Sequence, residues 1–282
     1  MFSTLISVAD LATHLDDPDW LVVDCRFELG KPSVGEAAYA AGHIPGAIYA
    51  HLDRDLASPI TSTSGRHPLP SPRQFADTLG NWGMTRETQV IAYDADNGAY
   101  AARLWWLLRW AGHSRVAVLD GGFKAWTAAG EPTNTQVPQR RTTVFDVTAN
   151  RDAWLDADQV TKNLQSSQWR LLDARAPERF AGTVEPIDPV AGHIPGARNH
   201  PFALDLAPSG QFHAPEELRA RFERSQAGVD DAHTIAMCGS GVTACHLLLA
   251  MEVAGKPGAK LYAGSWSEWI RDPRRPIATG AY

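Results

Sequence analysis

The segment at residues 41–47 reads AGHIPGA, and the same seven letters return at residues 191–197. Weaker matches surround both copies in the same order: WLVVDCR at 20–26 resembles WRLLDAR at 169–175. Further along, LDGGFKAW at 119–126 resembles YAGSWSEW at 262–269. Seven consecutive identities with ordered flanking matches predict a tandem duplication of two related domains, and not a solenoid of short units.

The length and the join between the copies agree with this prediction. At roughly 150 residues per domain, a chain of 282 residues favours two domains. Residues 131–143 are polar, contain two prolines and show no apolar period, which is typical of a linker. We therefore predict a first domain over residues 1–132, a linker over 133–143 and a second domain over 144–282.

Each copy alternates short apolar runs with helical stretches. The runs predict buried strands, and the stretches between them begin with cap or proline signals and end at glycine. This alternation indicates an α/β fold in each domain, a mostly parallel sheet with helices on both faces. The expected strands are 21–24, 89–94 and 116–120 in the first copy, and 170–174, 234–238 and 259–263 in the second.

Composition argues against several other classes of protein. The formal net charge is -6, so there is no basic footprint for nucleic acid, and no run of about 18 apolar residues predicts a membrane span. Three cysteines do not make a disulfide scaffold. The first residues lack the pattern of a signal peptide, so we expect a protein of the reducing cytoplasm.

The most informative loop follows the expected strand 234–238 and reads CGSGVTA at residues 238–244. Ligands of parallel α/β sheets lie beyond the carboxyl ends of the strands. Gly239 and Gly241 allow a tight wrap that aims backbone N–H groups inward, and the helix that follows adds the positive end of its dipole. We therefore expect a reactive Cys238 thiolate, with Ser240 and Thr243 hydroxyls beside it.

Three other interpretations of this loop fit less well. A dinucleotide fingerprint needs an acidic residue at the end of the next strand, where the chain has Tyr262-Ala-Gly264. A cysteine phosphatase carries an arginine where this chain has Ala244. Cys245 and His246 occupy adjacent, non-facing helix positions, so core packing explains them better than a metal site.

These motifs, in this order and spacing, resemble the two-domain rhodanese family of sulfurtransferases over essentially the whole chain. The resemblance implies that only the second domain is catalytic and that Cys238 carries a persulfide. Asp94 is the first-copy counterpart of Cys238, and its loop has no thiol. The loop residues Gly239, Gly241, Val242 and Thr243 are then expected to hold the transferred sulfur.

The resemblance also implies a ping-pong reaction without a metal or an organic cofactor. Cys238 attacks the outer sulfur of a small anionic donor, and cyanide or a thiol such as thioredoxin then accepts the sulfur. Thiosulfate enzymes carry Arg-Lys after the cysteine, whereas this chain carries Gly239 and Ser240, which resembles the 3-mercaptopyruvate type. Arg179 matches the arginine that binds the donor's anionic group.

Two alternatives stay open. Mercaptopyruvate enzymes usually have a second arginine nine residues later, and the stretch 183–189 is shorter and has none, so thiosulfate remains a possible donor. A tandem module that only binds partners is the alternative from another class, because one copy has already lost its cysteine.

Two histidines open the repeated HIPG turns. In the family, the first-domain histidine has been proposed to relay protons with the serine, so His43 is a candidate partner of Ser240; a purely architectural role is the alternative. His193 occupies the same motif where no catalysis is expected. Phe27, Tyr100 and His67 lie on first-copy loops that could line a cleft.

Overall fold

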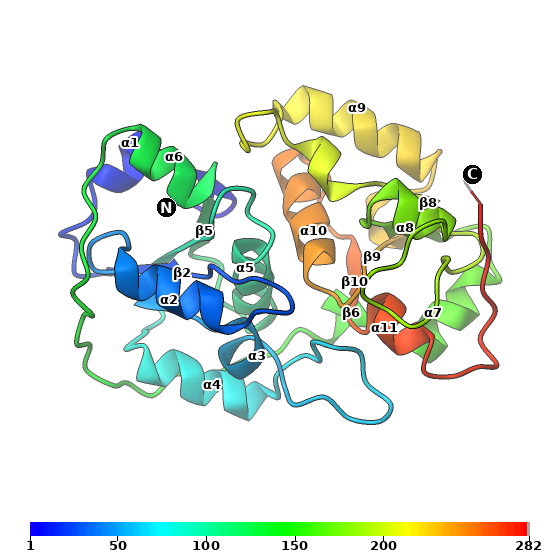
Figure 1. Ribbon diagram of the computed structural model, residues 1–282, viewed down its shortest axis with the longest axis horizontal. Coiled ribbons are helices and arrows are strands. Elements are labelled where there is room, and N and C mark those ends of the chain that lie inside the picture. Colours follow the sequence, from blue (N-terminus) through cyan, green and yellow to red (C-terminus); the bar gives the residue numbers. More distant parts are fainter. Residues whose placement is uncertain (281–282) are drawn as a thin grey trace. The chain divides into compact units, whose positions relative to one another are not determined.

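The computed structural model describes residues 1–280, which form two compact units (Figure 1). Unit 1 comprises residues 1–58, 69–150 and 207–212. Unit 2 comprises residues 59–68, 151–206 and the described residues from 213 onward. The stretch predicted as a linker, 133–143, therefore belongs to unit 1, and the short segment 59–68 of the predicted first domain belongs to unit 2.

Each unit is built around a five-stranded parallel sheet, and the two sheets have the same strand order. In unit 1 the order is β1-β5-β4-β2-β3, and in unit 2 it is β6-β10-β9-β7-β8. This confirms the α/β fold class and the duplication. The strands are β1 Leu5–Ile6, β2 Trp20–Asp24, β3 Ile48–Tyr49, β4 Gln89–Tyr93, β5 Val116–Leu119, β6 Trp154–Leu155, β7 Arg170–Asp173, β8 Arg198–Asn199, β9 Thr234–Met237 and β10 Lys260–Tyr262.

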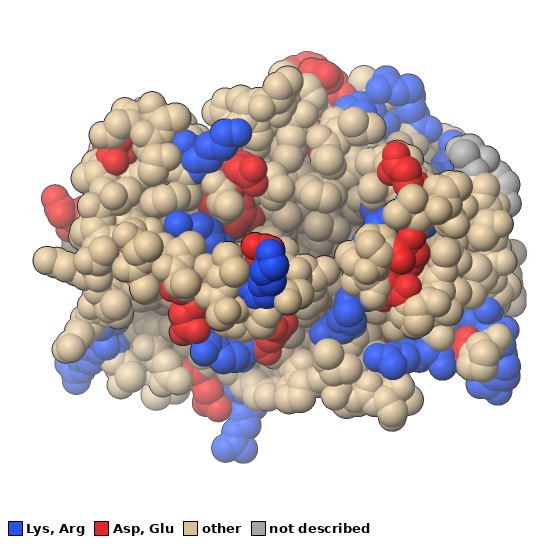
Figure 2. All heavy atoms as spheres, viewed as in Figure 1, with Lys and Arg blue, Asp and Glu red and all other residues tan. Residues whose placement is uncertain are grey.

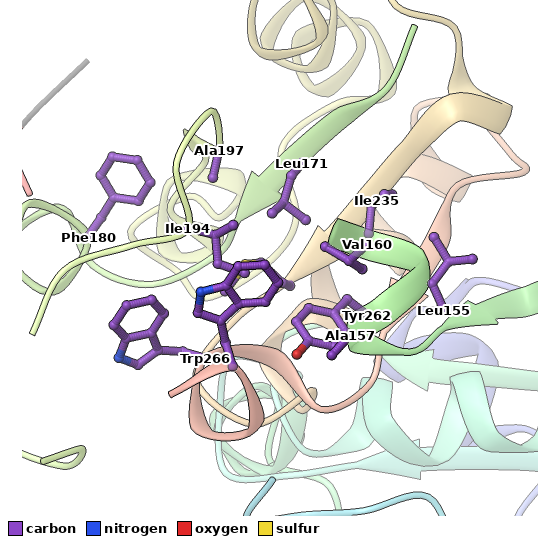
Figure 3. Close-up of a cluster of buried hydrophobic side chains, with 12 residues drawn as sticks. Leu155, Ala157, Val160, Leu171, Phe180, Ile194, Ala197, Ile235, Tyr262 and Trp266 are labelled. Atoms are coloured by element: carbon purple, nitrogen blue, oxygen red, sulfur yellow. The ribbon is translucent and has the colours of Figure 1, made fainter. Parts of the chain in front are cut away.

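Helices cover both faces of the unit 2 sheet. Alternate strand residues such as Leu171, Ile235 and Tyr262 enter a core that also takes side chains from α7, α8 and α11. Figure 3 shows part of this core, with Tyr262 beside Ala157 of α7. Helices α9 and α10 contact β7, β9 and β10 as well. The helices of this unit are α7 Ala157–Leu164, α8 Pro177–Ala181, α9 Pro215–Gln226, α10 Thr243–Val253 and α11 Ser265–Trp269, with 3-10 turns at Arg151–Ala153, Phe202–Asp205 and Asp231–His233.

Unit 1 repeats this plan around its own core, in which Ile91, Tyr93 and Trp126 are buried. Helix α4 begins with a capping box, because the Ser71 hydroxyl accepts from the backbone N–H of Gln74 and the Gln74 side chain accepts from the N–H of Ser71. The helices are α1 Val8–Ala12, α2 Ser33–Ala41, α3 Leu52–Asp55, α4 Pro72–Asn81, α5 Ala101–Trp110 and α6 Gly122–Ala128.

An aspartate and an arginine brace the end of the equivalent strands β2 and β7. Arg26 Nη2 donates to Asp24 at 2.6 Å and to the carbonyl of Gly42 at 2.7 Å. Arg175 Nη2 makes the same two contacts, to Asp173 at 2.6 Å and Gly192 at 2.8 Å. In each unit the arginine therefore links the end of the strand to the glycine that precedes the HIPG motif. This shared contact accounts for the aspartate, arginine and glycine that both copies contain.

On the face shown in Figure 2, acidic and basic side chains lie scattered among one another. Within the described part of the chain, no helix is both long enough and apolar enough to cross a lipid bilayer.

Candidate active site

The loop after β9 holds Cys238 in a tight turn. Cys238 is 2% exposed, and its Sγ accepts a hydrogen bond from the N–H of Gly241 at 3.1 Å. Gly241 has a φ of +79°, and a Cβ at this position would lie 2.2 Å from the carbonyl oxygen of Ala263. Only glycine fits here, so the turn that points an N–H at the sulfur depends on this residue.

Helix α10 and a buried arginine add positive potential at the sulfur. Thr243 is the first residue of α10, so the positive N-terminal end of this helix's dipole faces the loop that holds Cys238. Arg175 lies with its guanidinium carbon 4.8 Å from the Trp266 ring centroid, and its charge interacts favourably with Cys238. Burial lowers the pKa of Arg175, but its interactions with Asp173, Glu185 and Cys238 together outweigh burial and the pKa is raised.

Residues between β10 and α11 form hydrogen bonds that hold the backbone of Cys238 in place. The Cys238 N–H donates to Ser265 Oγ at 3.0 Å, and Ser265 Oγ donates to the carbonyl of Tyr262 at 2.9 Å. Ser265 has a φ of +53°, which is unusual for a residue with a side chain. Its first-copy counterpart is Gly122, with a φ of +58°, so a serine here retains a strained backbone that glycine would relax. Sequence reasoning passed over Ser265 because the repeat only marked it as scaffold.

Ser240 bonds a histidine, but a different one from the histidine we expected. Ser240 Oγ lies 2.7 Å from Nδ1 of His67, and both residues are nearly buried. His67 belongs to the 59–68 segment of unit 2. The sequence had placed it only as a residue that could line a cleft.

His43 and His193 serve their own turns. The His43 ring is fully buried and stacked on Tyr39, with Nδ1 2.8 Å from the Tyr39 carbonyl and Nε2 3.1 Å from the Gln136 carbonyl. His193 is stacked on Phe180 and contacts its carbonyl in the same way. Because the repeated motif does the same work in both units, the architectural interpretation of His43 fits, and the histidine beside Ser240 is His67.

Arg179 on α8 lies beside Gly239, at the opening of the loop. A Cβ built on Gly239 would lie 3.5 and 3.6 Å from the two terminal nitrogens of Arg179. The guanidinium is held by Glu185, with Nε 3.1 Å from both of its carboxylate oxygens, and by Asp188 at 3.0 Å. Burial raises the pKa of Glu185, but the hydrogen bonds from Arg179 and from the N–H groups of Asp188 and Ile187, with the charge of Arg179, together outweigh it and the pKa is lowered.

A second arginine, Arg66, reaches the same place and was missed in the sequence. A Cβ on Gly239 would lie 2.9 Å from Nη2 of Arg66, and Nη1 of Arg66 pairs with Asp188. The backbone N–H of Arg66 donates to Ser267 Oγ at 3.0 Å, which anchors the segment beside α11. The only sequence signal near Arg66 was the adjacent His67, which we expected to line a cleft. Sequence order placed both residues in the first domain, so no pattern connected Arg66 with the Cys238 loop.

The remaining predicted residues line the turn or pack beneath it. Val242 is 5% exposed, and Thr243 is half-buried. Cys245 and His246 are fully buried on α10, and the Cys245 thiol donates to the Gly241 carbonyl at 3.3 Å. Both are therefore part of the scaffold beneath the loop, as the sequence indicated.

The equivalent loop of unit 1 already contains an anion. The Asp94 carboxylate accepts from the N–H groups of Gly98 at 2.9 Å, Tyr100 at 2.8 Å and Ala101 at 3.2 Å. Burial raises the pKa of this carboxyl group. The nest that a sulfur anion would need is thus filled by the chain's own side chain.

Comparison with known proteins agrees with the repeat and the loop. The Rhodanese-like domain family matches residues 7–129 and again residues 156–272. A probable 3-mercaptopyruvate sulfurtransferase from Pseudomonas aeruginosa is 49% identical, over 98% of this chain and 98% of that protein. A putative thiosulfate sulfurtransferase from Mycobacterium tuberculosis is 40% identical, over 98% of this chain and 97% of that protein.

Solved structures give the same result. The 3-mercaptopyruvate sulfurtransferase of Leishmania major superposes with a TM-score of 0.84 and 33% identity, covering 96% of this chain and 76% of that one. SseA from Escherichia coli, described with the 3-mercaptopyruvate sulfotransferases, gives 0.82 and 32%, covering 94% of this chain and 100% of that one. The chain therefore belongs to the rhodanese family of sulfurtransferases, with one Rhodanese-like domain in each half.

Proposed function

We propose that the protein transfers a sulfane sulfur from 3-mercaptopyruvate, through a persulfide on Cys238, to a thiophilic acceptor. The observation that carries this proposal is the arrangement around one sulfur. Cys238 Sγ accepts from the Gly241 N–H at 3.1 Å, and two guanidinium groups lie beside Gly239.

In the first half-reaction, the Cys238 thiolate attacks the thiol sulfur of the donor. A sulfur–sulfur bond forms and the donor's carbon–sulfur bond breaks. The electron pair of the broken bond goes to carbon, which gives the enolate of pyruvate. That enolate takes up a proton, and the donor's thiol gives one up.

Ser240 and His67 are the residues suited to move this proton. Their 2.7 Å contact is short enough for proton transfer within a hydrogen bond. The persulfide that remains on Cys238 is an anion, and the N–H groups of the turn formed by Gly239, Gly241, Val242 and Thr243 stabilise its terminal sulfur.

The donor's carboxylate is assigned to Arg179. A guanidinium binds a carboxylate with two parallel hydrogen bonds, and this one stands at the loop's mouth. The loop carries no cation at Gly239 or Ser240, which favours a carboxylate donor over a dianion. Thiosulfate is the second candidate donor, supported by the 40% identical relative described as a putative thiosulfate sulfurtransferase.

In the second half-reaction an acceptor attacks the terminal sulfur and restores the Cys238 thiolate. Cyanide serves as the assay acceptor, and a thiol such as thioredoxin is the cellular acceptor that this chemistry suits. The sulfur moves as a neutral atom and each attack brings its own electron pair, so the scheme uses no metal and no organic cofactor.

Donor loading followed by cyanide release tests the proposal. The protein is incubated with each donor, freed of it by gel filtration and treated with cyanide, and the thiocyanate is measured. We expect loading from both donors, with a higher kcat/KM for 3-mercaptopyruvate, and none in Cys238→Ser. If neither donor forms a persulfide, the enzymatic role is overturned and a binding module remains. A higher kcat/KM for thiosulfate would overturn only the assignment of 3-mercaptopyruvate as the donor.

A further inference from the structure

Two arginines and one carboxylate meet at the mouth of the Cys238 loop. Arg66 and Arg179 both lie within contact distance of a Cβ placed on Gly239. Asp188 lies between them: Oδ1 pairs with Nη1 of Arg66, and Oδ2 lies 3.0 Å from Nη2 of Arg179. Its side chain is 3% exposed. One buried carboxylate therefore accepts hydrogen bonds from both guanidinium groups.

The position of Asp188 is informative. It stands nine residues after Arg179, within the stretch where the sequence suggested that a second donor-binding arginine was missing. Arg66 arrives from a segment 122 residues away and contributes the positive charge that this stretch lacks. Its Nε is buried and has no hydrogen-bond partner among the described residues, so the guanidinium retains an unused donor.

The network as a whole has no formal net charge before a donor binds. Three arginines and three carboxylates contribute +3 and -3, which sum to zero. Glu185 links two of the arginines, because it accepts from Arg179 and lies 3.5 Å from Nη1 of Arg175. The members are Arg66, Arg175, Arg179, Asp173, Glu185 and Asp188.

We propose that Arg66 is the second arginine of the donor site and that Asp188 sets the charge of the donor that the site accepts. This inference rests on the sulfurtransferase function proposed above. A donor carboxylate can displace or share the contacts of Asp188, because it replaces one negative charge by another. A dianion such as thiosulfate brings one charge more into a site that still holds Glu185 and Asp188, and it is disfavoured.

The charge of the site acts most directly on the ratio of the kcat/KM values for the two donors. Coulomb energy is proportional to the charge of the donor. Removal of one carboxylate therefore relieves twice as much repulsion for a dianion as for a monoanion. A geometric disturbance of the arginines affects both donors, and it cancels in the ratio of their kcat/KM values. Asp188→Asn should therefore raise the thiosulfate-to-mercaptopyruvate ratio by roughly tenfold or more, since close charges in a desolvated site interact strongly.

Two variants extend the test into a charge series. Arg66→Gln lowers the charge of the site by one and should lower the same ratio by a similar factor, while KM for mercaptopyruvate rises. Asp158→Asn is the matched control: it makes the same chemical change on α7 of the same unit, where the side chain is 96% exposed, and should leave the ratio unchanged.

The experiment measures steady-state kcat/KM for both donors in the full-length wild type and in each variant, with folding checked by circular dichroism. A ratio that rises in the order Arg66→Gln, wild type, Asp188→Asn supports the proposal. A ratio that stays within about twofold in both site variants, or that moves the other way, overturns it. If Asp188→Asn does not fold, Arg66→Gln alone decides by the same criterion. Loss of transfer from both donors in the wild type would instead refute the sulfurtransferase function itself.

Discussion

The contact between Ser240 and His67 predicts that the two sulfur donors depend differently on proton transfer. Loss of sulfur from 3-mercaptopyruvate leaves an enolate that must be protonated, whereas loss of sulfur from thiosulfate leaves sulfite, a stable anion that needs no proton. The substitutions His67→Gln and Ser240→Ala each remove one side of the 2.7 Å contact. They should therefore slow mercaptopyruvate turnover selectively.

The size of the effect follows from the role. A positioned general acid–base group contributes about 10²- to 10⁴-fold in rate, which is about 3–5 kcal/mol of transition-state stabilisation. We expect kcat for mercaptopyruvate to fall by about 10²-fold or more in either variant, and kcat for thiosulfate to change by less than about tenfold. The double variant should be little worse than either single one, because the two residues act as a unit.

Pre-steady-state measurement of persulfide formation provides the assay, since it isolates the first half-reaction from sulfur release. His43→Gln is the control: His43 is buried against Tyr39 and Gln136, so its substitution should affect stability without changing the donor ratio. Equal losses for both donors in His67→Gln would refute the relay. So would a selective loss for mercaptopyruvate in His43→Gln.

Two further predictions concern the loop itself. Gly241→Ala should abolish persulfide formation from both donors, because a left-handed backbone costs a residue with a Cβ about 1–2 kcal/mol and the Cβ would meet the Ala263 carbonyl at 2.2 Å; intact-protein mass spectrometry after donor addition checks this, and normal loading would contradict it. Ser265→Ala should expose the Cys238 amide to hydrogen exchange roughly ten- to hundredfold faster, because a buried N–H left without its acceptor costs about 1–3 kcal/mol. Ser265→Gly removes the same acceptor and should speed exchange of this amide to a similar extent, but it should lower the free energy of unfolding less, since glycine relaxes the φ of +53° there; wild-type exchange rates in both variants would disprove the bracing role.

The fold was predictable because its signals are local and doubled. The second AGHIPGA and the strand–loop–helix around Cys238 are each contiguous in the chain, and both strand order and loop position in the structure agree with them. The sequence also predicted that the first copy is not catalytic, because Asp94 stands at the position equivalent to Cys238 and a loop without a thiol cannot carry sulfur. The Asp94 carboxylate accepts hydrogen bonds from the backbone N–H groups of that loop, so the turn keeps its shape without a sulfur anion.

The contacts made by the segment at residues 59–68 could not be predicted. His67 and Ser240 are 173 residues apart, and Arg66 and Asp188 are 122 apart, so no periodicity or spacing connects them. Domain reasoning by sequence order assigned this segment to the first copy, whereas its contacts with Ser267 and Gly264 belong to unit 2. His43 was expected to relay protons because of a family resemblance. The carbonyl that its Nε2 contacts belongs to Gln136, 93 residues away, and no sequence pattern predicts this contact.

The most direct test of the central claim is to locate the transferred sulfur. Wild-type protein, Cys238→Ser and the double variant Cys25→Ser/Cys245→Ser are each mixed with 3-mercaptopyruvate, alkylated and mapped by peptide mass spectrometry. The persulfide mechanism predicts one added sulfur atom on the peptide that contains Cys238 in the wild type and the double variant, released by cyanide, and none in Cys238→Ser. Sulfur found on Cys25 or Cys245, or pyruvate formed by Cys238→Ser at the wild-type rate, would contradict it.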